Sequence, residues 1–600
     1  MAARPSFMTL PTELLEAIFL QLDPRSLIDV SLTAKHLKAI TTDSPVIWRH
    51  YCLTRFKMWD PLHNISAKVA APLSHVDWRA LLIHRTRVRQ DTRRLLNNIL
   101  HTQQGRIQMI NRVAGFGYDA KETLLDEYSC PDDADDVLAR RYYANAILER
   151  IQREMAIHVW RDLYSGKNVP IEVALGAYDI FTCTGDDVDL NVITRDIDDL
   201  AKAVERQHPR FKELSTREKA STLASFLRGQ GFLGVSDSSY RALCNSFIGL
   251  ALHSSAHESL PLISVAIYCA LASRLGLDAR PCGFLFHVYC LVYAPKDYNL
   301  DGEYKPTSST DLNFMYLDPF RSTNEVEQTD LQRVLWEMGV PTSEHEAFLS
   351  PTGTREIVLR TARNIMNSVQ TIRQNEAGPY GIHATWLNAY PDMDNAFYAT
   401  IWAMLMLGPR EEEDATGISN RSTRRRQYLP YLLEHFQTHY PWDVTLLEEH
   451  VVPLFSNQPE GQRLLAFVYS MQTMDNTRKP VNRRSERTKD VKFKIGQLFK
   501  HKRYHYEGVI TGWDTTCDAG EEWIQHMGVD RLAHGRHQSF YHVLVCDKSV
   551  RYVAEENISP ATPLQQPSEA MLKLAGRHFK RWDEENHVFV SNVRDEYPDD

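Results

Sequence analysis

The sequence predicts a multidomain α+β protein: a three-helix N-terminal module, a mostly helical middle that contains an α+β core, and a small C-terminal antiparallel β-barrel. Three observations predict this class. The chain has 600 residues, several times the usual size of one domain. Apolar residues recur at helical spacing over most of its length, but from about residue 493 they alternate with a period of two. Glycines cluster at 229–234 and interrupt the helical pattern there.

The composition excludes several classes of protein. A hydrophobic fraction of 43% and a charged fraction of 24% are typical of a globular chain rather than a disordered or fibrous one. The net charge of −9 argues against a dedicated nucleic-acid or membrane-surface protein. No run approaches the ~20 apolar residues of a membrane span, and residues 1–10 lack a signal-peptide core. We therefore expect a cytoplasmic or nuclear protein that does not associate with membranes.

The nine cysteines are scattered along the chain, and no two of them form a CxxC pair. This spacing argues against a zinc ribbon or a redox motif and favours free thiols.

Residues 7–55 predict three short helices. Apolar residues follow helical spacing in two stripes, which the Asp23-Pro24 pair separates because a residue before proline avoids the helical region. A module of this size buries little surface and needs a partner to cover its apolar face.

The same segment carries an ordered set of residues: Leu10-Pro11-Thr12-Glu13-Leu14-Leu15-Glu16-Ala17-Ile18-Phe19, then Leu22-Asp23-Pro24 and Leu27, then Pro45-Val46-Ile47-Trp48-Arg49. This set resembles an F-box. The resemblance implies a docking surface for the Skp-family adaptor of a cullin ubiquitin ligase. We expect the adaptor-binding face to consist of nine residues: Leu10, Pro11, Leu14, Leu15, Ile18, Leu22, Pro24, Leu27 and Trp48.

The middle of the chain divides into two helical regions around an α+β core. Residues 78–228 and 326–476 are predicted to be helical, and 408–427 within the second is charged and poor in large apolar residues, which predicts an exposed loop. Between them, 229–325 predicts a long apolar helix over 260–275, with strands following at 283–293 and 313–317.

Five short motifs mark the core: Gly231-Phe232-Leu233-Gly234, Leu260-Pro261-Leu262-Ile263-Ser264, Ala272-Ser273-Arg274-Leu275-Gly276-Leu277, Phe286-His287-Val288 and Leu317-Asp318-Pro319-Phe320. They resemble the SirB-type transglutaminase-like core. Enzymes of this kind use a cysteine at the start of a buried helix, followed by a histidine and an aspartate, because a helix N-terminus and an imidazolium favour the thiolate. The resemblance implies that His287 and Asp318 hold the histidine and aspartate positions, and that Pro261 lies at or next to the nucleophile position.

No cysteine stands at that nucleophile position, so we expect a core without catalytic residues or a cofactor. Cys269 lies eight residues further along the helix, ~12 Å away at 1.5 Å per residue, whereas a nucleophile must lie within ~3 Å of its base. Ser259 precedes the helix and is predicted to be its cap. Pro261, His287 and Asp318 then form a degenerate triad, with His287 and Asp318 joined by a hydrogen bond. The other nearby cysteines do not start a helix: Cys244, Cys282 and Cys290.

The C-terminal part begins with a basic linker at 477–490. Strands with period two follow over 491–560, separated by turns at Gly496, Gly508, Gly512 and Gly535, and no helix is predicted before Met571. Residues 561–600 are predicted to be a tail.

Sequence runs in 491–560 resemble the YccV or HspQ-like family, also called the hemimethylated-DNA-binding domain: Lys492-Phe493-Lys494-Ile495-Gly496-Gln497, Tyr506-Glu507-Gly508-Val509-Ile510, Trp513-Asp514, Phe540-Tyr541-His542-Val543-Leu544-Val545 and Tyr552-Val553-Ala554-Glu555-Glu556-Asn557-Ile558. The segment holds nine basic and nine acidic residues, and this even balance argues against DNA as its partner. The basic run at 477–490 is typical of a solvated linker.

Four histidines in this segment raise the question of a metal: His526, His534, His537 and His542. They have no cysteine or carboxylate at ligand spacing, so no metal site is predicted.

The order F-box, SirB-type core, YccV-like domain resembles the F-box only protein 21 family. It implies a substrate-recognition subunit of an SCF-type ubiquitin ligase, which acts by holding a target near the conjugating enzyme. Unidentified protein substrates are expected to bind the core and the YccV-like domain. Two alternatives remain: a ligase-tethered transglutaminase-like or protease-like hydrolase, and a DNA-associated adaptor that acts through the YccV-like domain.

Overall fold

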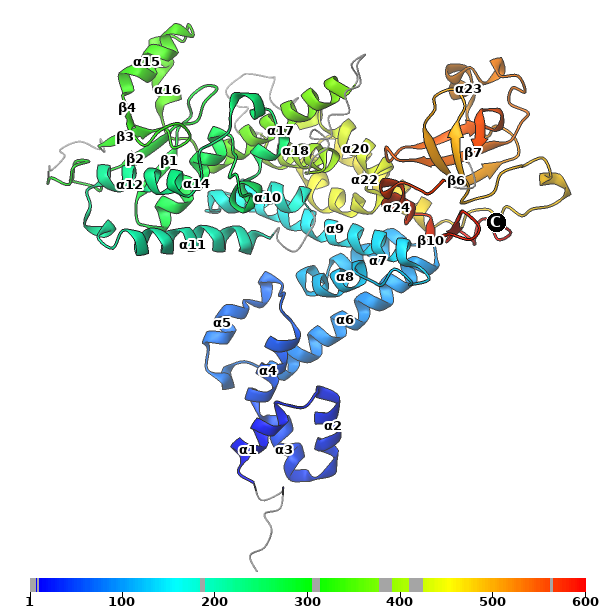
Figure 1. Cartoon of the computed structure of the whole chain (residues 1–600), viewed down its shortest axis with the longest axis horizontal. Coiled ribbons are helices and arrows are strands. Elements are labelled where there is room, and N and C mark those ends of the chain that lie inside the picture. Colours follow the sequence, from blue (N-terminus) through cyan, green and yellow to red (C-terminus); the bar gives the residue numbers. More distant parts are fainter. Residues whose placement is uncertain are drawn as a thin grey trace, which may run out of the picture. The chain divides into compact units, whose positions relative to one another are not determined.

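The computed structural model describes residues 7, 10–183, 189–304, 313–376, 391–408, 425–561 and 565–600. The chain divides into two compact units, whose elements are labelled in Figure 1. The first comprises Met1–Ile151, Thr438–Thr445 and Gln462–Asp600, and the second Gln152–Gln437 and Leu446–Gly461. Most of the loop predicted at 408–427 lies outside the described residues.

The N-terminal module contains four short helices: α1 (Thr12–Phe19), α2 (Pro24–Thr33), α3 (Lys35–Asp43) and α4 (Pro45–Arg55). The sequence pattern predicted three. The second apolar stripe forms two helices because Ala34 is extended, with φ −154° and ψ 146°, and so ends α2 and precedes α3. Asp23 caps α2: its carboxylate accepts hydrogen bonds from the amides of Arg25 and Ser26 at 2.8 and 3.2 Å.

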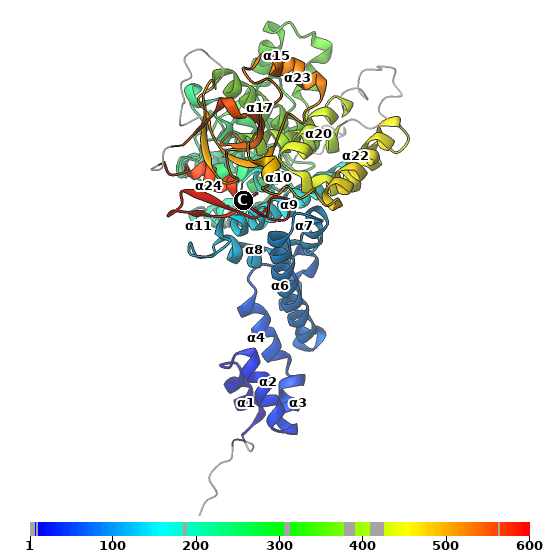
Figure 2. The same cartoon turned by 90° about the vertical axis from the view of Figure 1, so that its right-hand side faces the viewer.

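The core of this module includes residues from outside it. Figures 1 and 2 show α1, α2 and α3 as one dark-blue bundle. Leu15 and Phe19 of α1 are fully buried, together with Ile47 of α4, and Trp78 and Leu82 of the long helix α6 (Trp78–His101) belong to the same cluster. Helix α6 therefore supplies part of the apolar surface that so small a module lacks.

Further helices of the first unit follow α4 in chain order: α5 (Ile65–Ala70), α7 (Arg106–Ala114), α8 (Lys121–Tyr128) and, after the second unit, most of α22 (Pro459–Asn476). Helix α9 (Val137–Tyr164) begins in the first unit and continues into the second.

The second unit is mostly helical: α10 (Ile171–Thr182), α11 (Leu190–Gln207), α12 (Thr216–Gly229), α13 (Ile248–His253), α14 (Pro261–Arg274), α15 (Gln328–Glu337), α16 (His345–Leu349), α17 (Thr354–Glu376), α18 (Met393–Leu407) and nearly all of α20 (Leu429–Thr438). The short helix α21 (Val444–Leu446) crosses the boundary between the two units. Helix α14 is central, since eleven of its fourteen residues are buried. It matches the long apolar helix that the sequence predicts over 260–275.

A four-stranded antiparallel sheet follows α14, with strand order β1-β2-β3-β4. Its strands are β1 (Asp278–Pro281), β2 (Cys290–Tyr293), β3 (Phe314–Leu317) and β4 (Glu325–Val326). The strand predicted over 283–293 is present only in its last four residues. The reason is a tight turn: the His287 amide donates to the Leu285 carbonyl at 2.6 Å, and Phe286 between them has φ +60°.

The C-terminal β domain is a five-stranded antiparallel sheet with strand order β8-β7-β6-β5-β9. The strands are β5 (Leu498–His501), β6 (Glu507–Asp514), β7 (Phe540–Val545), β8 (Val550–Ala554) and β9 (Ile558–Pro560). Their pairing confirms the predicted small antiparallel sheet but does not close it into a barrel, because among the described residues β8 pairs only with β7 and β9 only with β5.

Two of the predicted glycine turns lie inside strand β6. A Cβ atom on Gly508 would lie 2.8 Å from the Phe499 ring and 2.9 Å from the Leu544 carbonyl oxygen, so this glycine allows close packing rather than a turn. Gly512 lies beside a register shift between β6 and β7. A short helix that the sequence pattern did not predict, α23 (Glu521–Met527), lies between β6 and β7 and ends at Gly528, which has φ +66°.

The C-terminal residues complete the core of the β domain. They form helix α24 (Glu569–Ala575) and the hairpin of β10 (Phe579–Asp583) and β11 (Val588–Ser591). Met571, Phe579 and Phe589 are buried in the same cluster as Val509 and Val543 of the sheet.

The hairpin segment also lies against the start of α9. A Cβ atom on Gly576 would lie 2.1 Å from the Leu138 carbonyl oxygen, and the Tyr143 hydroxyl donates to the Arg577 carbonyl at 3.0 Å. The predicted tail is thus a packed part of the first unit.

Candidate functional site

The exposed face of the N-terminal module is strongly apolar. Leu14 and Ile18 of α1 are 52% and 39% exposed, and Ile28 and Leu32 of α2 are 54% and 75% exposed. Each pair is four residues apart, so its members lie on the same face of their helix. Exposed apolar side chains gathered on neighbouring helices are typical of a protein-binding surface.

The structure separates the nine predicted adaptor-binding residues into two groups. Leu15 and Leu27 are buried at 0% and 1% exposure, so they support the module from inside. The other seven reach the surface wholly or in part: Leu10, Pro11, Leu14, Ile18, Leu22, Pro24 and Trp48.

Ile28 and Leu32 were not in the predicted set. Part of the signal for Ile28 is in the sequence, because adjacent residues of an α-helix point about 100° apart, so Ile28 is turned away from the direction of buried Leu27.

The start of α14 carries no nucleophile. Pro261 is the first helical residue, where its missing amide hydrogen costs nothing. Ser259 does not cap the helix as predicted. Its hydroxyl lies 2.8 Å from the Ser264 hydroxyl, and Leu260 occupies the N-cap position without a side-chain hydrogen bond.

His287 and Asp318 form the predicted pair. His287 Nε2 lies 2.9 Å from Asp318 Oδ2, and both side chains are largely buried. The imidazole is enclosed by the rings of Tyr289 and Phe320, whose centroids lie 4.7 and 5.9 Å from its own. Beside it, Phe286 is 83% exposed in the left-handed conformation that non-glycine residues rarely adopt. The residue directly before His287 in the chain is therefore an exposed aromatic one.

The four cysteines of the core have other hydrogen-bond partners than His287. Cys269 Sγ and Cys290 Sγ lie 3.7 Å apart, Cys282 donates to the Phe348 carbonyl, and Cys244 bonds to Asn245. Burial raises the pKa of Cys282 to about 11 and that of Cys290 well above the usual value of a thiol. An activated nucleophile needs the opposite shift.

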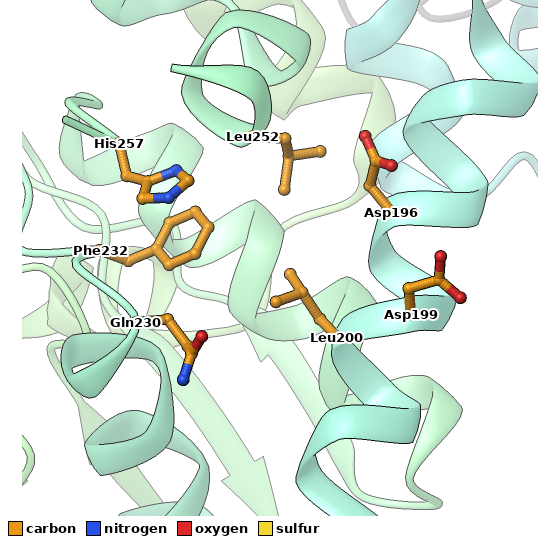
Figure 3. A pocket seen from close by; sticks show the side chains of 7 residues that line it. All are labelled: Asp196, Asp199, Leu200, Gln230, Phe232, Leu252 and His257. Carbon is orange, nitrogen blue, oxygen red and sulfur yellow. The ribbon is translucent and has the colours of Figure 1, made fainter. Parts of the chain in front are cut away.

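A cavity of 270 Å³ lies beside the glycine-rich loop of the core (Figure 3). Phe232 and His257 form one wall, with their rings stacked at 4.2 Å between centroids. Helix α11 forms the opposite wall with Asp196 and Asp199, and leucines lie between the two walls. Both carboxylates already have basic partners, since Asp196 lies 2.7 Å from His253 and Asp199 lies 2.8 Å from Lys202.

Three basic side chains of the linker form ion pairs, and two of them, Lys479 and Arg483, stay 60% and 66% exposed to solvent. Lys479 lies 2.9 Å from Glu596, and Arg483 lies 3.3 Å from Asp599. Arg484 bonds to Asp600 at 2.8 Å. These ion pairs offset three of the six basic residues of the linker, which weakens its attraction for a DNA backbone.

Two of the four histidines considered as metal ligands in the β domain, His534 and His542, lie against acidic groups. His534 Nδ1 lies 3.1 Å from Glu556, and His542 Nε2 lies 3.2 Å from Asp514. Tyr552 donates to the same Asp514 oxygen at 2.8 Å.

Three family models match the chain and account for the regions described. They are F-box-like over residues 7–54, the transglutaminase-like superfamily over 191–363, and hemimethylated DNA-binding protein YccV like over 491–586. The second match includes α11, which carries one wall of the cavity. The chain thus carries an F-box-like module, a transglutaminase-like core and a YccV-like β domain.

Among curated proteins the chain is similar to F-box only protein 21 of Homo sapiens, Mus musculus and Pongo abelii. Each is 42% identical over 118 residues, which is 20% of this chain and 18% of the relative. No solved structure matches the chain significantly. Among the described residues, no helix is long and apolar enough to cross a membrane.

Proposed function

We propose that this protein is a substrate-recognition subunit of an SCF-type ubiquitin ligase. The observation that carries the proposal is the exposed apolar face of α1 and α2 within the F-box-like segment. Covering Leu14, Ile18, Ile28 and Leu32 removes apolar area from water at a gain of roughly 25 cal/mol per Å². A Skp-family adaptor, itself bound to a cullin, is the partner that fits this segment.

The protein acts by proximity and supplies no acid, base or nucleophile of its own. The start of α14 has proline in place of the cysteine that a transglutaminase-like enzyme needs, and burial raises the pKa of the Cys282 and Cys290 thiols. A receptor of this kind raises the effective concentration of the target's lysines near the conjugating enzyme. A ligase-tethered hydrolase and a DNA-associated adaptor are weaker candidates, because the first lacks a nucleophile and the second has ion-paired linker cations.

Substrates bind the transglutaminase-like core and the YccV-like domain. On the core, exposed Phe286 offers an apolar anchor, and the cavity between Phe232 and Asp196 offers a recess for a substrate side chain. Neither feature requires that His287 react with the substrate.

The test uses Leu14→Asp combined with Ile18→Asp in the full chain. Both side chains are exposed, so the module stays folded, while two carboxylates in an apolar interface cost several kcal/mol, on the order of a whole binding free energy. Co-purification of the Skp-type adaptor should be lost, and other bound proteins should remain. Substitution is preferable to deletion of residues 1–55, which would expose Trp78 and Leu82 of α6.

The matched control carries Leu233→Asp and Leu465→Asp, which add the same charge at positions 57% and 46% exposed. The control should retain the adaptor. Undiminished adaptor binding by the double variant in the module would contradict the proposal.

A further inference from the structure

Two histidines and an aspartate meet in the first unit, outside the regions discussed above. His63 ends the short helical turn Pro61–His63, His84 belongs to α6, and Asp119 lies in the turn Gly117–Ala120 before α8. His63 Nε2 lies 2.6 Å from Asp119 Oδ2, and His84 Nε2 lies 3.6 Å from the same oxygen. The three ligand atoms all lie within 4.8 Å of one another.

Hydrogen bonds hold the three segments together. Asp60 accepts from the Leu62 amide at 3.0 Å with one oxygen, which caps the turn that ends at His63. Its other oxygen accepts from the Tyr118 amide at 3.1 Å and so ties this turn to the turn that contains Asp119. The positions of His63 and Asp119 are therefore set by backbone contacts rather than by their own interaction.

Asp119 presents one carboxylate oxygen to the two imidazoles. Its other oxygen, Oδ1, lies 2.7 Å from the guanidinium of Arg85 and accepts from the Asp60 amide at 3.1 Å. The side chain of Asp119 is 4% exposed and that of Arg85 is fully buried, so this orientation is firmly held. A carboxylate whose second oxygen is hydrogen-bonded in this way is the usual arrangement around a metal ligand.

Asp119 supplies the anionic ligand atom of the cluster. Asp119 and Glu122 are the two carboxylates near the guanidinium of Arg85, with Glu122 3.9 Å from it and also bonded to the amides of Lys57 and Met58. Because Arg85 contacts Asp119 through Oδ1, Oδ2 remains directed at the two imidazoles. His84 is 53% exposed, so an ion can reach the cluster from solvent.

We propose that His63, His84 and Asp119 bind a zinc ion through Nε2, Nε2 and Oδ2. Two imidazoles and a carboxylate are a common ligand set for Zn²⁺, and a water molecule at the open side would complete a tetrahedron. Bond lengths of about 2.0–2.1 Å place tetrahedral ligands about 3.3 Å apart. The observed separations of 2.6 and 3.6 Å lie on either side of that value, so small side-chain rotations suffice.

The ion would act as a staple within the first unit. It would join the segment that follows α4 to α6 and to the turn before α8. Since α6 also supplies Trp78 and Leu82 to the N-terminal module, the staple would stiffen the support on which the adaptor-binding face is built. Metal binding of this kind adds directly to folding stability.

The test is a titration of the chelator-treated full chain with ZnCl₂ by calorimetry, repeated with CoCl₂ while visible absorption is recorded. We expect the chain to bind one equivalent of zinc, which raises its melting temperature. With cobalt we expect absorption bands typical of tetrahedral coordination by nitrogen and oxygen ligands. His84→Ala should weaken this site at least about 100-fold, because second-shell partners alone are worth roughly 10- to 100-fold. His84 is exposed, so the variant keeps its fold.

Two controls make the result specific. His101→Ala removes another exposed histidine from α6 and should leave binding unchanged. The described part of the chain holds a second group of potential metal ligands, Glu154, His158 and His450. His158→Ala removes a member of that group and should leave zinc binding at His63, His84 and Asp119 unchanged. Zinc binding retained by His84→Ala, or lost in His158→Ala instead, would overturn the proposal, as would the absence of any zinc binding by the wild-type chain.

Discussion

The N-terminal module and the transglutaminase-like core depart from the usual distribution of side chains in opposite directions. The module leaves Leu14 and Leu32 in water, whereas the core buries His287 and Asp318. Exposed apolar surface is stabilised by covering it with another molecule, while a buried polar group must find its partner inside the chain. The module is therefore built for contact with a second protein, whereas Asp318 of the core is partnered inside the chain through Oδ2 and, among the described residues, its buried Oδ1 has no hydrogen-bond partner.

The largest expected effect tests this contrast at two adjacent positions. Leu15→Asp should unfold the N-terminal module, because it removes a fully buried leucine, worth about 2–5 kcal/mol, and puts a charge in its place. Leu14→Asp should change stability by no more than about 0.5 kcal/mol but should abolish adaptor binding. Hydrogen exchange of α1 to α4 in the full chain measures the first effect and adaptor co-purification the second. An equal loss of protection from hydrogen exchange in both variants would contradict the assignment of Leu15 to the core and Leu14 to the binding surface.

A second prediction concerns Asp179, a buried carboxyl group in the second unit. Its Oδ1 accepts from the amides of Gly249 at 2.8 Å and Leu250 at 3.3 Å at the start of α13, yet burial raises its pKa from 3.8 to about 7. Between pH 4 and 7 the folded protein keeps this proton and the unfolded chain loses it, so stability falls as the pH rises.

Asp179→Asn keeps the acceptor and cannot ionise. At pH 8 the variant should be more stable than wild type by a few kcal/mol, and near pH 4 the two should differ little. The size follows from the pKa difference between the folded and the unfolded chain, since each pKa unit corresponds to ~1.4 kcal/mol. Melting temperatures across this range measure the effect, with the exposed Asp237→Asn as control. A gain that does not depend on pH would show that Asp179 is ionised in the folded protein.

The smallest expected effect is that of His287→Ala. The variant lacks the hydrogen bond to Asp318, so its free energy of unfolding should fall by about 1 kcal/mol. Ubiquitination of bound partners should remain nearly intact. Thermal unfolding and a ligase assay measure the two outcomes. A thiol-directed probe should label none of the four core cysteines in a His287-dependent way. Loss of a deamidase, protease or cross-linking activity in this variant alone would mean that the core is catalytic.

Short-range patterns in the sequence predicted the helices of the module, the long apolar helix of the core and the strands of the β domain. They did not distinguish Leu14 from Leu15, because the buried side of α1 is chosen by residues far along the chain, such as Tyr51 and Trp78. The prediction of a strand over 283–293 was wrong in its first part because Phe286 adopts a left-handed backbone conformation that interrupts the strand. Nothing in the residue type of a phenylalanine indicates that conformation.

The candidate sites differ in the same way. The pairing of His287 with Asp318 was accessible through resemblance, because their motifs are recognisable one by one. The group of His63, His84 and Asp119 has no motif, and its members come from three segments that only the fold brings together. The ion pair between Arg484 and Asp600 joins residues 116 positions apart, which no spacing rule reaches.

The packing of α24 and the β10–β11 hairpin into the sheet has a consequence for protein synthesis. Strands β5 to β9 leave the ribosome before Met571, Phe579 and Phe589, which their core requires. A stop codon or frameshift between residues 561 and 570 would produce a chain with strands β5 to β9 present but without the three apolar residues that complete their core and without Gly576, which packs on Leu138 and Tyr142. Such truncated products should be degraded rather than accumulate as active fragments.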